Sequence, residues 1–394
     1  MIKSPITFAV QATSASPPTP ADTPVSSAIP PQTEPAARPN TAHKRPEVSY
    51  IRVLAALAVV QLHTIGEVLY YFDPEKPYDE QWWVGNIYYS MLRWATPFFI
   101  LLSGSIMLHP GRPDTTVQFL KKRARRILPP FFFWSVVYLI YLYRGNIYYE
   151  EWPKFSEVMD VILFKDIYYH LWFLPMIMGM YLLTPSFRIF IRHAHRRDIE
   201  YFLVFSFIVT ALQHFIPNLF LVKYIGWLGY ISFYVLGYYL SQYTLPWKKI
   251  FYAIALAMPP LTAFLTWWLS CSDAAYSNKV FVYSSPNVVI MTTALFLFLR
   301  ERDWRAFAER FPRVSALVHR MAPYSFGVYF VHVLLLDVLK NGYIGGIHCS
   351  YKFFFNLPVH PIYGALVQAC FVAALSFSLI ALLSKIPGMK KWLM

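Results

Sequence analysis

The chain has 394 residues, of which 57% are hydrophobic and only 14% are charged, whereas a soluble domain usually has roughly 25% charged residues. This composition excludes an ordinary soluble domain and indicates an integral membrane protein. The net charge of +14 does not indicate a nucleic-acid partner, because the basic residues alternate with membrane-length apolar runs instead of covering one soluble face.

The two ends of the chain differ in composition from the region between them. Residues 1–47 are rich in proline, alanine, serine and threonine, and such a segment cannot bury enough apolar surface to offset its chain entropy. We therefore expect a disordered, proline-rich cytoplasmic tail over residues 1–47. A transmembrane domain is expected over 48–386, followed by a short basic cytoplasmic C-terminus over 387–394.

Apolar segments follow one another through the region after residue 47. Each has approximately the 17–25 residues that a helix needs to cross the hydrocarbon of a bilayer. They lie at about 49–71, 88–108, 127–143, 171–190, 200–216, 223–240, 249–270, 284–299, 323–340 and 361–384. The sequence therefore predicts an all-α fold, a polytopic bundle of about ten transmembrane helices.

Lysine and arginine concentrate in alternate loops between these segments, as expected of loops that stay in the cytoplasm. The basic clusters lie at 44–45, 121–126, 188–197, 248–249, 300–320 and 385–391. Both termini are therefore predicted to be cytoplasmic, which suits a multi-pass protein of a bacterial inner membrane. This topology puts Cys271 and Cys349 on the outer face, where a disulfide or two separate thiols are both open.

The first segment carries three ionisable residues, which are expensive inside a membrane and need a partner or a function. Arg52 and His63 are eleven residues apart, so a helix places them on one face about 16 Å apart along its axis. Glu67 lies one turn beyond His63 on nearly the same face, where it could hold or protonate that imidazole. A snorkelling arginine and a structural histidine are the alternatives, but the shared stripe favours a polar channel.

The second segment reads MLRWATPFFILLSG and places a proline, Pro97, inside a predicted helix. Arg93 lies near the predicted outer end, at the depth of Glu67, and could pair with it or hold an anionic substrate group. Ser103 and Gly104 allow a close approach of two helices, which explains them without any chemistry.

The basic stretch FLKKRARRILPP precedes the third segment and contains Arg123 and Arg126 one helical turn apart. Such a pair could form a phosphate clamp that opens towards Arg52. A topology determinant beside anionic lipid headgroups is the alternative interpretation.

Two later stretches hold further candidates. His170 and Trp172, in YYHLWF, could line a sugar site, although the aromatic residues there also suit a membrane interface belt. Tyr329 and His332, in SFGVYFVH, lie on adjoining turns with Ser325 and are interpreted as a structural hydrogen-bonded cluster. The cysteines show no metal-ligand spacing, so no metal site is predicted.

Together these stretches resemble the acyltransferase-3 family of integral membrane acyltransferases, and within it the O-acetyltransferases of bacterial surface polysaccharides. The resemblance covers about residues 48–384. It is carried by Arg52 and His63 in R-x10-H, by Arg93, Pro97, Phe98, Phe99, Ser103 and Gly104 in the second segment, by Arg123 and Arg126 in R-x-x-R, by His170 to Phe173, and by Ser325, Gly327, Tyr329 and His332.

The resemblance implies transfer of an acetyl group from cytoplasmic acetyl-CoA to a sugar hydroxyl, with no permanently bound cofactor. The acceptor would be a surface polysaccharide or an undecaprenyl-linked precursor. His63 would act as general base, and Arg52, Arg123 and Arg126 would bind the phosphates of the donor. The helical distance from Arg52 to His63 is comparable with the length of an extended pantetheine arm.

Two other functions are open from the sequence. A proton-coupled transporter of a sugar or lipid-linked intermediate would also explain charged residues within many membrane segments, although such carriers usually contain a two-fold repeat that we do not find. A sensor or scaffold would use the proline-rich tail to recruit a partner through extended docking segments.

Overall fold

The computed structural model describes residues 46–70, 78–216, 219, 228–273, 276–340, 353–354 and 357–394. The predicted tail over 1–47 lies outside the described residues except for its last two, which begin the first helix. Cys349 also lies outside them, so its pairing with Cys271 stays a prediction. The three domain boundaries given above stay predictions as well.

Helices make up nearly all of the described chain. The α-helices are α1 (Pro46–Tyr70), α2 (Glu80–Leu92), α3 (Ala95–Met107), α4 (Thr116–Leu142), α5 (Arg144–Tyr148), α6 (Phe155–Phe164), α7 (Phe173–His193), α8 (Arg196–Phe215), α10 (Leu228–Gln242), α11 (Lys248–Asp273), α12 (Pro286–Arg300), α13 (Trp304–Arg310), α14 (Pro312–Met321), α15 (Ser325–Lys340), α16 (Pro361–Leu383) and α17 (Lys390–Leu393). Two short 3-10 helices, η1 (Lys279–Phe281) and η2 (Ala322–Tyr324), and a hairpin of β1 (Phe353–Phe354) and β2 (Leu357–Pro358) complete them. The predicted helical fold class is confirmed.

Six stretches of the described chain are long and apolar enough to cross a membrane. They are Glu47–Gly66, Phe173–His193, Lys248–Ser272, Lys279–Arg300, Pro312–Lys340 and Ile362–Leu383. The other four predicted segments also contain helices, in α2 and α3, α4, α8 and α10, but the count of ten stays a prediction. Large apolar side chains such as Phe132, Leu182, Val204, Leu256 and Leu382 are exposed on the outer helices, where a bilayer would cover them. The protein is therefore a multi-pass membrane protein.

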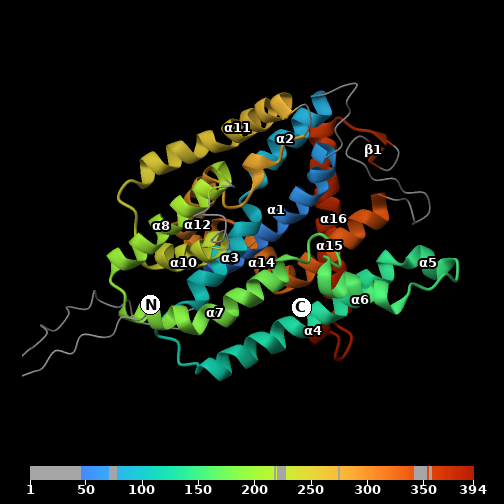
Figure 1. Cartoon of the computed structure of the whole chain (residues 1–394), viewed down its shortest axis with the longest axis horizontal. Coiled ribbons are helices and arrows are strands. Elements are labelled where there is room, and N and C mark those ends of the chain that lie inside the picture. Colours follow the sequence, from blue (N-terminus) through green and yellow to red (C-terminus); the bar gives the residue numbers. More distant parts are fainter. Residues whose placement is uncertain are drawn as a thin grey trace, which may run out of the picture. The chain divides into compact units, whose positions relative to one another are not determined.

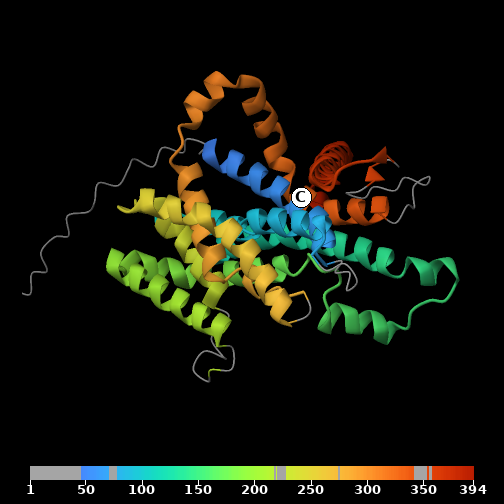
Figure 2. The ribbon, with the colours of Figure 1, turned by 90° about the horizontal axis from the view of Figure 1, so that it is seen from above.

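Helix α1 lies in the middle of the helices that surround it. It packs against α2 and α3 on one side and against α14, α15 and α16 on the other (Figure 1). In the view from above, α1 lies between the C-terminal helices, drawn in orange and red, and the earlier helices in blue-green and green (Figure 2). Residues that α1 carries therefore face neighbours from both halves of the chain.

The second predicted segment is two helices and not one. Helix α2 ends at Leu92 and α3 begins at Ala95, with Arg93 and Trp94 between them. Pro97 causes the break, because its nitrogen cannot donate to the carbonyl of Arg93 and its ring crowds that carbonyl. The prediction of a single helix across this segment was wrong, since a new helix begins at Ala95, two residues before the proline, and contains Pro97 in its first turn.

Helices α3 and α10 approach each other closely at two glycines. A Cβ on Gly104 would lie 1.8 Å from the carbonyl oxygen of Tyr234, and one on Gly237 would lie 2.0 Å from the carbonyl oxygen of Leu101. Backbone atoms cannot move aside as the end of a side chain can, so both positions require glycine. This contact fixes α3, which lines the site described below.

Replacing Gly104 with alanine is expected to destabilise the fold by more than about 3 kcal/mol, because the added methyl group overlaps main-chain atoms. The measurement is the yield and thermal unfolding of detergent-solubilised protein, followed by size-exclusion chromatography. Gly179→Ala in α7 is the matched control, because its Cβ would meet open space and alanine favours a helix. A folded Gly104→Ala protein with the stability of this control would contradict the packing described here.

Candidate active site

A cavity lies between α1, α3, α4, α7 and the start of α15, and the volume open to the centre of a water molecule is about 170 Å³. Residues singled out from the sequence line much of it: Arg52, His63, Ser103, Arg123, Arg126, His170, Trp172, Ser325 and Tyr329. They come from five separate parts of the chain. The fold therefore brings most of the predicted site residues to one place.

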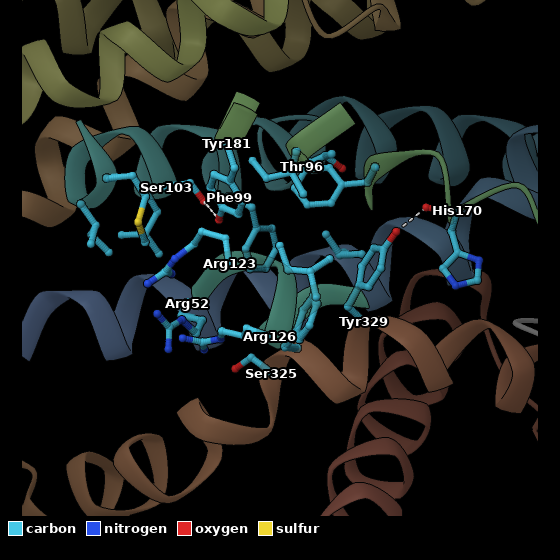
Figure 3. A pocket seen from close by; sticks show the side chains of 18 of the residues that line it. Arg52, Thr96, Phe99, Ser103, Arg123, Arg126, His170, Tyr181, Ser325 and Tyr329 are labelled. Carbon is cyan, nitrogen blue, oxygen red and sulfur yellow. Dashed lines mark hydrogen bonds between the residues drawn. The ribbon is translucent and has the colours of Figure 1, made fainter. Parts of the chain in front are cut away.

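Three arginines gather at one end of this cavity (Figure 3). Arg52 comes from α1, and Arg123 and Arg126 lie one turn apart on α4. Arg52 and Arg126 are close enough for their charges to interact, and no carboxylate is among the described residues that line the cavity. Like charges without a counter-charge in a half-buried place favour an anionic ligand.

Helix α4 begins at Thr116, earlier than the apolar segment predicted from residue 127. The basic stretch with Arg123 and Arg126 is therefore part of the helix. Its first turn is capped by Thr115 and Gln118, each of whose side chains accepts from the backbone N–H of the other. The basic stretch is thereby helical, so that Arg123 and Arg126 share a face of α4. The same helix continues through Pro129 and Pro130 into the apolar segment.

Three histidines meet at the other end of the cavity. The ring centroids of His63 and His332 are 5.2 Å apart, those of His63 and His170 are 6.4 Å apart, and those of His170 and His332 are 5.7 Å apart. The hydroxyl of Tyr329 donates to the backbone carbonyl of His170 at 2.5 Å. This bond ties the chain before α7 to α15, as Figure 3 shows.

His332 is fully buried and its ring is oriented by α15. Its Nδ1 lies 3.0 Å from the carbonyl oxygen of Val328, an acceptor, so Nδ1 carries the proton. Nε2 of the neutral ring then holds a lone pair, and this buried atom has no hydrogen-bond partner among the described residues. The sequence indicated a structural role for His332. It gave no sign of the contact with His63, because α1 and α15 are far apart along the chain and meet only in the folded protein.

A tyrosine of α4 also fixes this part of α15. The hydroxyl of Tyr138 donates to the carbonyl of Phe330 at 2.6 Å and accepts from the N–H of Leu334 at 3.1 Å. A side chain inserted between residues four apart interrupts the helical hydrogen-bond ladder at that turn. His332 lies within the turn that Tyr138 holds, so α4 contributes to the placement of the histidine cluster.

Aromatic side chains form the wall beside the histidines. The rings of Trp172 and Tyr283 stack with centroids 5.8 Å apart, and Tyr283 donates to the hydroxyl of Thr96 at 3.1 Å. The guanidinium of Arg93 lies 3.9 Å from the Tyr283 ring centroid and donates to the hydroxyls of Tyr283 and Tyr89 and to the carbonyl of Phe281. Arg93 therefore lies behind this wall and holds Tyr283, while its expected pairing with Glu67 or with an anionic substrate group stays a prediction.

The remaining predicted residues lie near the cavity or outside the description. Gly104 is the contact point of α3 with α10, and His332 touches the cavity through His63. The side chain of Glu67 lies outside the described part of the chain, so its role stays a prediction. Thr96, Tyr181 and Tyr283 line the cavity without having been singled out, and nothing in their local sequence could have revealed it.

Ser325, Tyr329 and His332 were expected to form a hydrogen-bonded cluster, but the hydrogen bonds of their side chains go to other residues. Tyr329 bonds to His170 and His332 bonds to Val328, while the buried hydroxyl of Ser325 has no partner among the described residues. The motif thus supplies groups to the cavity and to the histidine cluster rather than bonds among its own members.

Comparisons with known proteins agree with a helical membrane protein whose cavity has arginines at one end and histidines at the other. Residues 45–385 match the acyltransferase-3 family, described as an acyltransferase domain. The chain belongs to the acyltransferase-3 family. It is also 25% identical over 330 residues, 76% of this chain and 82% of the other, to the protein named "Putative membrane-bound acyltransferase YfiQ" of Bacillus subtilis (strain 168). No solved structure is a significant match.

Membership in the acyltransferase-3 family identifies the protein as a membrane acyltransferase, as the sequence predicted. Among the residues described for this acyltransferase, no group of three or more His, Cys, Asp or Glu side chains is arranged to hold a metal ion.

Proposed function

We propose that this acyltransferase moves an acetyl group from cytoplasmic acetyl-CoA to a sugar hydroxyl of a cell-surface polysaccharide or its undecaprenyl-linked precursor. It would act as a multi-pass protein of a bacterial inner membrane, with both termini in the cytoplasm. The observation that supports this most is the composition of the cavity, which has three arginines at one end and His63 at the other. Acyl-CoA has the same polarity, with phosphates at one end and a thioester at the other.

The donor fits the cavity in one direction. Arg52, Arg123 and Arg126 would bind its phosphates through charge-assisted hydrogen bonds. Arg52 and His63 lie about 16 Å apart along α1, so the pantetheine arm would run beside this helix. Phe99, Ile106 and Ile177, which line the cavity, offer the arm an apolar surface. The thioester would then lie against the histidine cluster.

His63 is the proposed general base. In its neutral form it takes the proton of the acceptor hydroxyl while the hydroxyl oxygen bonds to the thioester carbonyl carbon. The carbon–sulfur bond then breaks, CoA leaves as the thiolate, and the proton passes from His63 to the sulfur. No other reactant is needed. Glu67 is the proposed partner of His63.

The acceptor would meet the aromatic wall. Trp172 and Tyr283 offer flat apolar faces of the kind on which sugar rings stack, and His170 and Thr96 add polar groups beside them. Arg93 would act on the acceptor through Tyr283, which it holds.

His332 is proposed to position His63, because its free Nε2 can accept a hydrogen bond from an N–H of that ring. Replacing His332 with phenylalanine is expected to lower kcat roughly fivefold and to leave the KM for acetyl-CoA unchanged, since one hydrogen bond is worth about 1 kcal/mol. His332→Gln, which keeps an acceptor, should recover part of the loss. Equal changes in both variants, or a change confined to KM, would contradict a positioning role.

The function itself is tested by purifying the protein in detergent and measuring CoA release from acetyl-CoA with candidate undecaprenyl-linked sugars. We expect release that depends on the acceptor and a product heavier by one acetyl group. A transporter would instead carry the sugar into proteoliposomes without acetyl-CoA and would release no CoA. That outcome would overturn the proposed function.

A further inference from the structure

Two arginines, the half-buried Arg123 and the buried Arg188, meet around Phe119 of α4, next to the cationic end of the cavity. The guanidinium carbon of Arg123 lies 5.6 Å from the centroid of the Phe119 ring, and that of Arg188, on α7, lies 4.3 Å from it. The two carbons are therefore separated by no more than the sum of these distances. Phe119 is fully buried, so the arginines meet inside the protein and not on its surface.

Both arginines have buried N–H groups without a partner among the described residues. These are Nε of Arg123 and Nη2 of Arg188. Arg188 is only 8% exposed, and its Nε donates to the carbonyl of Met107 at 2.8 Å. That bond fixes the guanidinium at the end of α3, with its second edge directed elsewhere. Buried charged donors are costly when unpaired, so two of them around one ring point to a place that can bind an anion.

The acidic residue nearest this pair is already engaged. Asp114 pairs with Arg112 at 3.6 Å and with Lys122 at 3.9 Å. Its charge also acts on Arg123 and Arg188, but one carboxylate faces four cations here. The surplus positive charge and the planar donors suit a phosphate group, which accepts several charge-assisted hydrogen bonds at once.

On the basis of the proposed function, we propose that Arg123 and Arg188 form a second phosphate subsite for the 3′-phosphate on the ribose of the acyl-CoA donor. Arg52 and Arg126 then bind the diphosphate. The covalent order of CoA supports this division, because the 3′-phosphate lies beyond the diphosphate from the thioester. The placement of the arginines suits this order: Arg123 lines the cavity, whereas Arg188 does not line it and lies across Phe119 from Arg123, bonded to Met107 at the end of α3.

The test compares the affinities of CoA and 3′-dephospho-CoA for the full-length protein in nanodiscs by isothermal titration calorimetry. We expect the natural protein to bind CoA at least about tenfold more tightly than 3′-dephospho-CoA. The reason is that 3′-dephospho-CoA lacks the phosphate that would accept charge-assisted hydrogen bonds from the two arginines. In Arg188→Leu this preference should fall to about twofold or less. Both ligands are measured on one preparation, so a partly unfolded variant changes the binding capacity and leaves the ratio of affinities unchanged.

Arg192→Leu is the matched control, because Arg192 lies one turn further along α7 and is exposed. It should keep the full preference for CoA. Arg188→Lys should keep part of it, since an ammonium retains the charge but not the planar pair of donors.

The outcomes separate this proposal from the proposed function. If neither ligand binds, the donor assignment fails and the subsite fails with it. If both bind equally tightly to the natural protein, acyl-CoA remains the donor but the 3′-phosphate subsite is wrong. A lipid phosphate could also fill the place, so the titration is repeated in nanodiscs of phosphatidylcholine alone and with phosphatidylglycerol. Equal binding of both ligands in both membranes would refute the donor assignment of this subsite.

Discussion

Replacing His63 with glutamine is expected to lower the rate of acetyl transfer by a factor of roughly 10²–10⁴, the usual contribution of a general base. Glutamine is close in size to histidine and can hydrogen-bond, but it cannot take a proton from the acceptor hydroxyl. The affinity for CoA should stay unchanged, because His63 lies at the end of the cavity opposite the arginines. The measurements are acceptor-dependent CoA release and direct titration with CoA.

A second histidine serves as the control for this substitution. His193, in the last turn of α7, is exposed and bonds to the carbonyl of Ile189 in its own helix. His193→Gln should leave both rate and affinity unchanged. Full transfer activity in His63→Gln would mean that the base is another group, and a loss of CoA binding would mean that His63 acts on the fold.

Replacing Arg52 or Arg126 with leucine is expected to raise the KM for acetyl-CoA by about 10- to 100-fold, since a hydrogen bond to a charged group is worth about 1.5–3 kcal/mol. The kcat at saturating donor should change much less, because these arginines hold the donor and do not touch the reacting atoms. Arg52→Lys should lie between the natural protein and Arg52→Leu, because it keeps the charge without the planar donors.

The neighbour of Arg126 tests whether the basic stretch acts by position or by charge alone. Arg125 is on the same helix, is exposed and does not line the cavity. Arg125→Leu removes the same charge from the same stretch of α4 and should leave the KM unchanged. If Arg125→Leu and Arg126→Leu raise the KM for acetyl-CoA equally, the basic stretch serves topology or lipid binding. The proposal that Arg126 binds the donor phosphates would then be wrong.

Helical arithmetic accounts for the part of the site that lies within single helices. Arg52 and His63 were expected on one face of one helix, and both line the same cavity. Arg123 and Arg126 were expected one helical turn apart, and both lie on α4 with this spacing. Such relations depend only on the rise and rotation per residue, so the sequence is enough to predict them.

Relations between helices were not predictable in this way. The contact of His63 with His332 depends on how α1 packs against α15, which is set by close contacts elsewhere in the fold. The burial of Arg188 depends on the end of α3 and on Phe119 of α4. In the sequence Arg188 is one arginine of the basic cluster at 188–197, and nothing near it indicates that it is buried. The break between α2 and α3 was missed for a different reason, since Pro97 marks it but the apolar pattern runs through it.

The central claim is that a bound acyl-CoA extends along α1 from the arginines to His63, and photoaffinity labelling tests it most directly. The purified protein is irradiated with a CoA thioester that carries a diazirine in its acyl chain, and the labelled peptides are located by mass spectrometry. We expect the label on or beside His63, His170 or Tyr329, and we expect acetyl-CoA to compete it away. A label at Arg52 and Arg126, or on the outer surface of the helices, would contradict the account.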